Sequence, residues 1–230
     1  MPQSNKSNKA NRPYDLIVWD WDGTIMDSTP TIVQCIQQAC RDLGFKAPDD
    51  TLASSVIGLG IQDSLRRAVP WVEPIHFQKL TERFRYHYLA KDHELDLFVG
   101  IRELLQELHD QQYLLGVATG KSRVGLDRSL KHHQIGHLFH ETRTADESFS
   151  KPHPGMLLEL SDVTQVPTRR MLMIGDTTHD LDMAANAGVD AVAVTYGAHP
   201  PSTLKESPSL VHVDNVAELS QWLKNNLVSK

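Results

Sequence analysis

The chain has 230 residues, of which 40% are apolar and 23% are charged, a composition typical of a soluble globular protein with a sizeable core. Its formal net charge of −6 argues against non-specific binding to nucleic acid or to anionic membranes, because both require a basic face. Cys35 and Cys40 lie five residues apart, a spacing that points them to different sides of a helix. We therefore expect no disulfide between them and a reducing, cytoplasmic compartment.

The N-terminal segment is polar and contains no apolar run. We expect residues 1–12 to be a disordered lead-in and not a secretory signal. No segment approaches the length of a membrane span, so we expect no membrane partner.

The first predicted strand spans residues 14–20, and the interval after it contains no convincing strand. Ser28 or Thr29 can cap a helix there, and Gly44 can end it. Two more helical patterns follow, at residues 61–69 and 74–91. We therefore expect residues 29–97 to form an inserted, all-helical cap domain.

From residue 98 onward, short apolar runs alternate with helical patterns. The predicted strands span residues 113–119, 139–144, 171–176 and 191–196. The predicted helices span residues 101–110, 122–133, 155–162, 179–187 and 215–226. Repeated strand–helix units predict an α/β fold with a doubly wound, mostly parallel sheet covered on both faces. Its core would consist of residues 13–28 and 98–230.

In a doubly wound sheet, ligands bind outside the carboxyl ends of the strands, and chemically unusual residues lie there in this sequence. They are Asp20, Asp22, Thr119, Lys151, Asp176 and Asp180. Clustered carboxylates repel one another unless a cation joins them, and an all-oxygen donor set suits magnesium better than zinc. Lys151 as a point charge and Thr119 as a hydroxyl donor can hold phosphate oxygens.

These residues carry a resemblance to a known family. VWDWDGTIMDS, the threonine of VATGKS, the lysine of SKPHP and the acidic IGDTTHDLDMA resemble the four motifs of the haloacid dehalogenase-like hydrolases. The resemblance runs from about Tyr14 to the end of the sequence. It includes the helical insertion, which is similar to the cap of the phosphoglycolate phosphatase-like branch. A Rossmann-like core is therefore implied, with a cap that closes over it and recognises the substrate.

The resemblance implies a catalytic role for each matching position. Asp20 would be the nucleophile that forms an aspartyl-phosphate. Asp22 would protonate the leaving oxygen and then activate the hydrolytic water. Thr119, Gly120 and Lys151 would bind the transferring phosphoryl group. Gly120 stands where many relatives have asparagine, a difference that is expected to alter substrate contacts.

The resemblance also implies the cofactor. Mg²⁺ would be held by a carboxylate oxygen of Asp20, the backbone carbonyl of Asp22 and the carboxylate of Asp176, with Asp180 in a supporting position outside these ligands. The partner would be a small phosphorylated metabolite, and phosphoglycolate is the substrate that the resemblance suggests. Sugar phosphates, nucleotides and pyrophosphate are alternatives. Whether the protein is a monomer or a dimer is left open.

Asp22 favours phosphoryl transfer, because the dehalogenases and the phosphonate-cleaving members of the family lack this aspartate. A sugar phosphomutase would keep it, but those mutases usually have a histidine soon after the first motif, and residues 28–31 contain none. A non-catalytic phosphate-binding module would need a lost catalytic residue, and none is missing. A magnesium-dependent phosphatase is therefore the preferred hypothesis.

Three features of the insertion are candidates for substrate specificity. Gly58–Gly60 forms a short glycine-rich turn, which in related phosphatases faces the active site. Arg66 and Arg85 are further candidates, although either is equally compatible with a solvated position on a helix.

Overall fold

The computed structural model describes residues 13–227, so the prediction for residues 1–12 lies outside the described part. The described residues form a six-stranded sheet in the order β3-β2-β1-β4-β5-β6, and every neighbouring pair is parallel. The strands are β1 (Leu16–Trp19), β2 (Leu114–Thr119), β3 (Glu141–Thr144), β4 (Met171–Gly175), β5 (Asp190–Val194) and β6 (Val211–Val213). The predicted doubly wound α/β fold is confirmed. β6 was not predicted, because a strand of three residues carries too little pattern.

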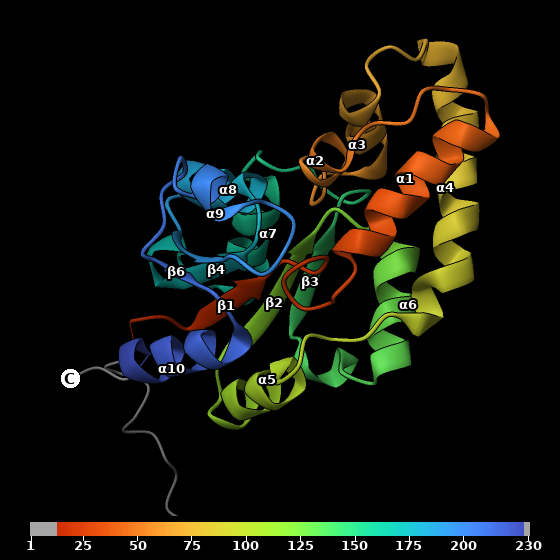
Figure 1. Cartoon of the computed structure of the whole chain (residues 1–230). Coiled ribbons are helices and arrows are strands. Elements are labelled where there is room, and N and C mark those ends of the chain that lie inside the picture. Colours follow the sequence, from red (N-terminus) through yellow and green to blue (C-terminus); the bar gives the residue numbers. More distant parts are fainter. Residues whose placement is uncertain (1–12, 228–230) are drawn as a thin grey trace, which may run out of the picture.

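Alternate side chains of β1 enter two different layers of the core. Ile17 and Trp19 pack in one buried cluster with residues of three core helices and with Cys35 and Tyr88 of the helical insertion, and Leu16 and Val18 pack in the opposite cluster with residues of three other helices. The first layer contains α5 (Ile101–Asp110), α6 (Arg123–His133) and α10 (Val216–Asn226). The second layer contains α7 (Gly155–Thr164), α8 (Thr178–Ala187) and α9 (Pro201–Leu204). Figure 1 shows α5 and α10 on one side of the sheet and α7 and α8 on the other. Short 3-10 helices occur at Pro74–His76, Asp92–Glu94, Gly136–Leu138 and Thr168–Arg170.

The segment between β1 and α5 is helical in the described structure and contributes no strand to the sheet. Its α-helices are α1 (Thr29–Asp42), α2 (Asp50–Ser54), α3 (Ile61–Ala68) and α4 (Phe77–Lys91), which gather apart from the sheet in Figure 1. Ile36, Leu65 and Leu80 are fully buried in a separate apolar cluster formed by this segment. We refer to α1–α4 as the cap, in keeping with the expected helical insertion.

No helix in residues 13–227 has the length and apolar character needed to cross a membrane. Cys35 and Cys40 are both free thiols buried on α1.

Candidate active site

The order of the strands brings two of the predicted aspartates together. The chain proceeds from β1 to β2 and β3 on one side and continues with β4 on the other, so β1 and β4 flank the switch point where ligands bind in such sheets. Asp20 follows β1, and its N–H donates to Ile174 O at 2.9 Å, which continues the pairing with β4. Asp176 follows β4. Ligand oxygens of Asp20, Asp176 and Asp180 lie within 4.8 Å of one another, and all three residues are buried.

A tight turn after β1 makes room for Asp176. The carbonyl of Trp21 accepts the N–H groups of Ile25 and Met26 at 2.9 Å each. Gly23 lies inside this turn with φ of +89°, and a Cβ atom there would lie 2.2 Å from Asp176 Oδ2. Glycine is therefore required at this position both by the backbone conformation and by the approach of the carboxylate.

The Asp176 carboxylate is fixed by two donors. Thr24 Oγ1 donates to Oδ1 at 2.8 Å, and the N–H of Ala198 donates to Oδ2 at 2.6 Å. Burial and the charge of Asp180 raise the pKa of Asp176 to about 7, against the opposing effect of these hydrogen bonds.

Lys151 joins two of the three carboxylates. Its fully buried Nζ donates to Asp20 Oδ1 and, at 2.6 Å, to Asp180 Oδ1. The other oxygen of Asp180 accepts from Thr177 N and Oγ1 and forms a capping box that begins α8. Burial lowers the pKa of Lys151, but the charges of Asp180 and Asp20 outweigh it and hold that pKa above its ordinary value.

The cluster carries more negative than positive charge. Lys151 balances only one of the three carboxylates, and Asp20 Oδ2 is buried without a hydrogen-bond partner in the described structure. Burial raises the pKa of Asp20 well above its ordinary value, the charge of Lys151 opposes this effect, and the charges of Asp180 and Asp176 add to it. An excess of buried carboxylate charge with an unpartnered oxygen fits a divalent cation.

Asp22 lies apart from this cluster and faces the cap. Its Oδ1 accepts from Ser28 Oγ at 2.7 Å, so the residue at the N-cap of α1 binds the aspartate and makes no side-chain hydrogen bond that caps its helix. Lys121 Nζ donates to Asp22 Oδ1 and Oδ2 at 3.0 and 3.1 Å, and to the hydroxyl of Tyr88 on α4 at 2.8 Å.

Thr119 and Gly120 lie at the end of β2, as expected from the sequence. Thr119 is buried, and its Oγ1 accepts the N–H of Lys121 at 3.1 Å, which leaves the hydroxyl hydrogen for another acceptor. A Cβ atom on Gly120 would lie 2.3 Å from the carbonyl oxygen of Leu59 and 2.6 Å from that of Gly58. The cap loop therefore rests directly on the backbone of Gly120.

Further hydrogen bonds join the cap to the core. The N–H of Gly60 donates to Ser150 Oγ at 3.1 Å. The carbonyl of Ser55 lies 3.0 Å from His179 Nε2 and 3.1 Å from His199 Nε2. Together with the contact at Gly120, these bonds hold the cap closed against the strand ends.

A comparison with known proteins shows to which family a chain with this fold and carboxylate cluster belongs. A family model described as haloacid dehalogenase-like hydrolase matches residues 17–194, which is most of the chain. The chain belongs to this family. The predicted resemblance is thus confirmed, and so is the assignment to the phosphatase class of enzymes.

Several relatives of this hydrolase are phosphatases. It is 30% identical over 201 residues to a phosphoglycolate phosphatase of Aliivibrio fischeri. This alignment covers 84% of this chain and 88% of the relative. It is also 30% identical to a phosphoglycolate phosphatase of Vibrio cholerae, over 79% of this chain and 84% of that one. A crystal structure of a predicted phosphoglycolate phosphatase from Haemophilus somnus superposes with a TM-score of 0.82 at 26% identity, over 91% of this chain and 98% of the other.

A β-phosphoglucomutase from Clostridium difficile has the same fold. It matches this hydrolase with a TM-score of 0.81, over 93% of this chain and 97% of the other, but at only 19% identity. That likeness concerns the fold alone.

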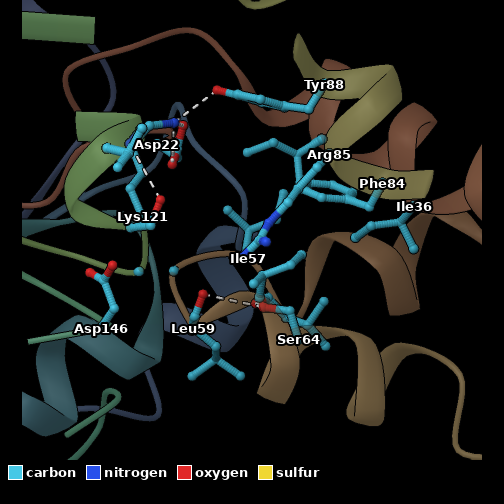
Figure 2. A pocket seen from close by; sticks show the side chains of 18 of the residues that line it. Asp22, Ile36, Ile57, Leu59, Ser64, Phe84, Arg85, Tyr88, Lys121 and Asp146 are labelled. Atoms are coloured by element: carbon cyan, nitrogen blue, oxygen red, sulfur yellow. Dashed lines mark hydrogen bonds and ion pairs between the residues drawn. The ribbon is translucent and has the colours of Figure 1, made fainter. Parts of the chain in front are cut away.

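A cavity of about 440 Å³ lies between the cap and the core of this hydrolase (Figure 2). Asp22, Lys121 and Gly120 contribute to its wall on the core side. Both arginines are exposed, but Arg85 reaches into the cavity from α4, whereas Arg66 is not part of its wall and its Nη1 lies 4.0 Å from Asp63 Oδ1. The structure therefore separates the two arginines that the sequence left as equal candidates.

Sequence reasoning missed Lys121, Tyr88 and Ser28. Lys121 was within reach, because it lies two residues after Thr119 at the same strand end. Tyr88 and Ser28 carry no local signal of their contact with Lys121 and Asp22, which arises only when α4 and α1 pack beside the end of β1.

Proposed function

We propose that this protein is a magnesium-dependent phosphomonoesterase that acts on a small phosphorylated metabolite through an aspartyl-phosphate on Asp20. The observation that carries the proposal is that the carboxylates of Asp20, Asp176 and Asp180 converge at the switch point of the sheet, with Lys151 Nζ bound to those of Asp20 and Asp180. The phosphatase relatives of similar length support it.

In the first step, a carboxylate oxygen of Asp20 attacks phosphorus while the ester P–O bond breaks. The leaving oxygen takes a proton from Asp22, which lies two residues along the same turn. In the second step, Asp22 accepts a proton from water as this water attacks the phosphorus of the aspartyl-phosphate. The bond between phosphorus and Asp20 then breaks, which releases inorganic phosphate and restores the carboxylate.

Lys151 and Thr119 are proposed to bind the oxygens of the transferring phosphoryl group, Lys151 through its ammonium and Thr119 through its free hydroxyl hydrogen. Gly120 directly follows Thr119 at the end of β2, and its backbone N–H is proposed to donate to the same phosphoryl group. The closed cap, which rests on Gly120, limits access of water to this region.

The metal would be held by a carboxylate oxygen of Asp20, the backbone carbonyl of Asp22 and the carboxylate of Asp176. When bound, Mg²⁺ would neutralise part of the charge that otherwise repels the phosphate dianion from Asp20. Asp180 would support the site by holding Lys151, since its Oδ1 accepts from Nζ at 2.6 Å.

The relatives named above are phosphoglycolate phosphatases, which supports a small phosphorylated compound as substrate. We propose that residues 13–28 and 98–230 form the catalytic core and residues 29–97 the cap. A cytoplasmic location stays a prediction from the sequence.

A panel of phosphate monoesters, assayed for inorganic phosphate with and without Mg²⁺, tests the proposal. We expect phosphate release that depends on the metal. A phosphomutase would isomerise a sugar phosphate without releasing phosphate, and a binding module would bind a metallofluoride phosphate mimic without turning over any ester. Either result would contradict the proposed function.

A further inference from the structure

The cavity between cap and core has much more room than a glycolate leaving group needs. Its volume of about 440 Å³ lies in the range of roughly 300–1,000 Å³ that is typical of pockets for drug-sized ligands. Asp20, Thr119 and Lys151, which would hold the phosphoryl group, do not line it. The whole volume is therefore available to the part of the substrate beyond the ester oxygen, with Asp22 at the boundary.

The wall of this cavity is mostly apolar. It includes the side chains of Ile32, Ile36, Ile57, Phe84, Leu89 and Val124. Leu89 and Val124 are 49% and 72% exposed, and a ring or a branched hydrocarbon would cover this apolar surface, whereas a hydroxy acid or sugar would not. The wall therefore favours a leaving group with an apolar body.

The charged groups of the wall are engaged, with one exception. Lys121 binds Asp22 and Tyr88, Arg128 pairs with Asp92 at 2.5 Å, and Asp146 accepts from the N–H of Arg123 and the hydroxyl of Thr144. Arg85 makes no hydrogen bond or ion pair with any residue in the described part of the chain. Figure 2 shows its guanidinium extending from α4 toward Ile57, across the cavity from Asp22 and Lys121.

We propose, on the basis of the phosphatase function above, that the natural substrate is a phosphate monoester whose leaving group has a ring-sized apolar body and a carboxylate at its far end. The body fills the cavity, and the carboxylate pairs with Arg85. Guanidinium groups bind carboxylates through two parallel hydrogen bonds, so Arg85 selects both the charge and the length of the leaving group.

Four esters test this assignment: phosphoglycolate, phenyl phosphate, 3-carboxyphenyl phosphate and 4-carboxyphenyl phosphate. In the wild-type protein we expect the preferred carboxyphenyl isomer to exceed phosphoglycolate in kcat/KM by at least about tenfold. Arg85→Ala is expected to reduce the ratio of kcat/KM between this isomer and phenyl phosphate by about 10- to 100-fold, mainly through KM. Because the same two esters are compared in both proteins, their intrinsic reactivities cancel from the change in this ratio. Arg85→Lys should retain part of the wild-type preference for the carboxyphenyl ester over phenyl phosphate.

Arg66→Ala is the matched control, because Arg66 is a cap arginine outside the cavity, and we expect its ratio to equal that of the wild type. Preference for phosphoglycolate over both ring esters would overturn the proposal, as would an equal ratio in the wild type and Arg85→Ala. If no ester, phosphoglycolate included, released phosphate, the proposed function itself would fail, and the inference with it. The two failures are thereby distinguishable.

Discussion

Lys121 binds both carboxylate oxygens of Asp22, with Nζ–Oδ distances of 3.0 and 3.1 Å. The same ammonium donates to the hydroxyl of Tyr88 at 2.8 Å, so a hydrogen-bonded chain runs from the cap to the residue proposed as acid and base. Burial lowers the pKa of Lys121, but the charge of Asp22 and the contact with Tyr88 hold that pKa above its ordinary value. Lys121 therefore stays charged and links the closed position of the cap to the orientation of Asp22.

Replacing Lys121 by methionine is expected to lower kcat/KM on phenyl phosphate by about tenfold or more, because Asp22 loses the group that orients it. Tyr88→Phe removes only the cap end of the chain and should have a smaller effect. Lys131→Met, at an exposed position of α6, is the control. Wild-type kcat/KM in Lys121→Met would show that the ion pair has no part in turnover.

Gly120→Ala is expected to displace the cap loop, since the new methyl group would meet the backbone carbonyls of Leu59 and Gly58. Backbone atoms cannot rotate away as a side chain does, so we expect the cap loop to move and kcat/KM to fall by about tenfold. Gly136→Ala is the matched control, because its nearest contact is an ordinary 3.6 Å from the Cβ of Leu130. Equal activity of the two variants would argue against close seating of the cap on Gly120.

Magnesium is expected to raise the melting temperature of the wild-type protein at pH 7.5. A ligand at a hundredfold its Kd stabilises the folded state by about 2.7 kcal/mol, and each kcal/mol raises Tm by roughly 2–4 °C for a chain of this size. Asp176→Asn should abolish the increase, whereas Asp182→Asn, on the same helix as Asp180 but outside the carboxylate cluster, should keep it. An unchanged increase in Asp176→Asn would remove Asp176 from the metal ligands.

The pH dependence of this effect follows from the raised pKa of Asp176. Without metal, the folded protein binds a proton that the unfolded chain has lost between pH 3.8 and about 7, so the contribution of Asp176 to stability decreases as pH rises through this window. Metal competes with the same proton. The Mg²⁺-induced increase in Tm should therefore grow from pH 5.5 to pH 7.5. An increase that is equal at both values would contradict a site at Asp176.

Much of the fold was predictable because its signals are local. The runs before Asp20 and Asp176 are short, apolar and bounded by polar residues, which is the pattern of buried parallel strands. Once these strands are adjacent, the residues that follow them must meet, so the carboxylate cluster was predictable from the chain order of its motifs.

The cap side of the site was not predictable in the same way. Arg66 and Arg85 both occur in amphipathic helical patterns, and only the packing of α4 over the strand ends decides which one reaches the cavity. Ser28 lies at the N-cap position of α1, as one of the two expected candidates, but its hydroxyl donates to Asp22 and does not cap the helix, because the turn after β1 brings the two side chains together. Such contacts depend on tertiary packing, and periodicity carries no information about them.

The central claim is that Asp20 is the nucleophile, and the most direct test compares phosphate release from phenyl phosphate by the wild-type protein and Asp20→Asn in the presence of Mg²⁺. Both proteins should first give cooperative thermal unfolding, so that a loss of activity is not a loss of fold. We predict a decrease in kcat on the order of 10³-fold or more in Asp20→Asn, because an amide cannot form the aspartyl-phosphate. A folded Asp20→Asn protein that hydrolyses the ester at nearly the wild-type rate would contradict the account.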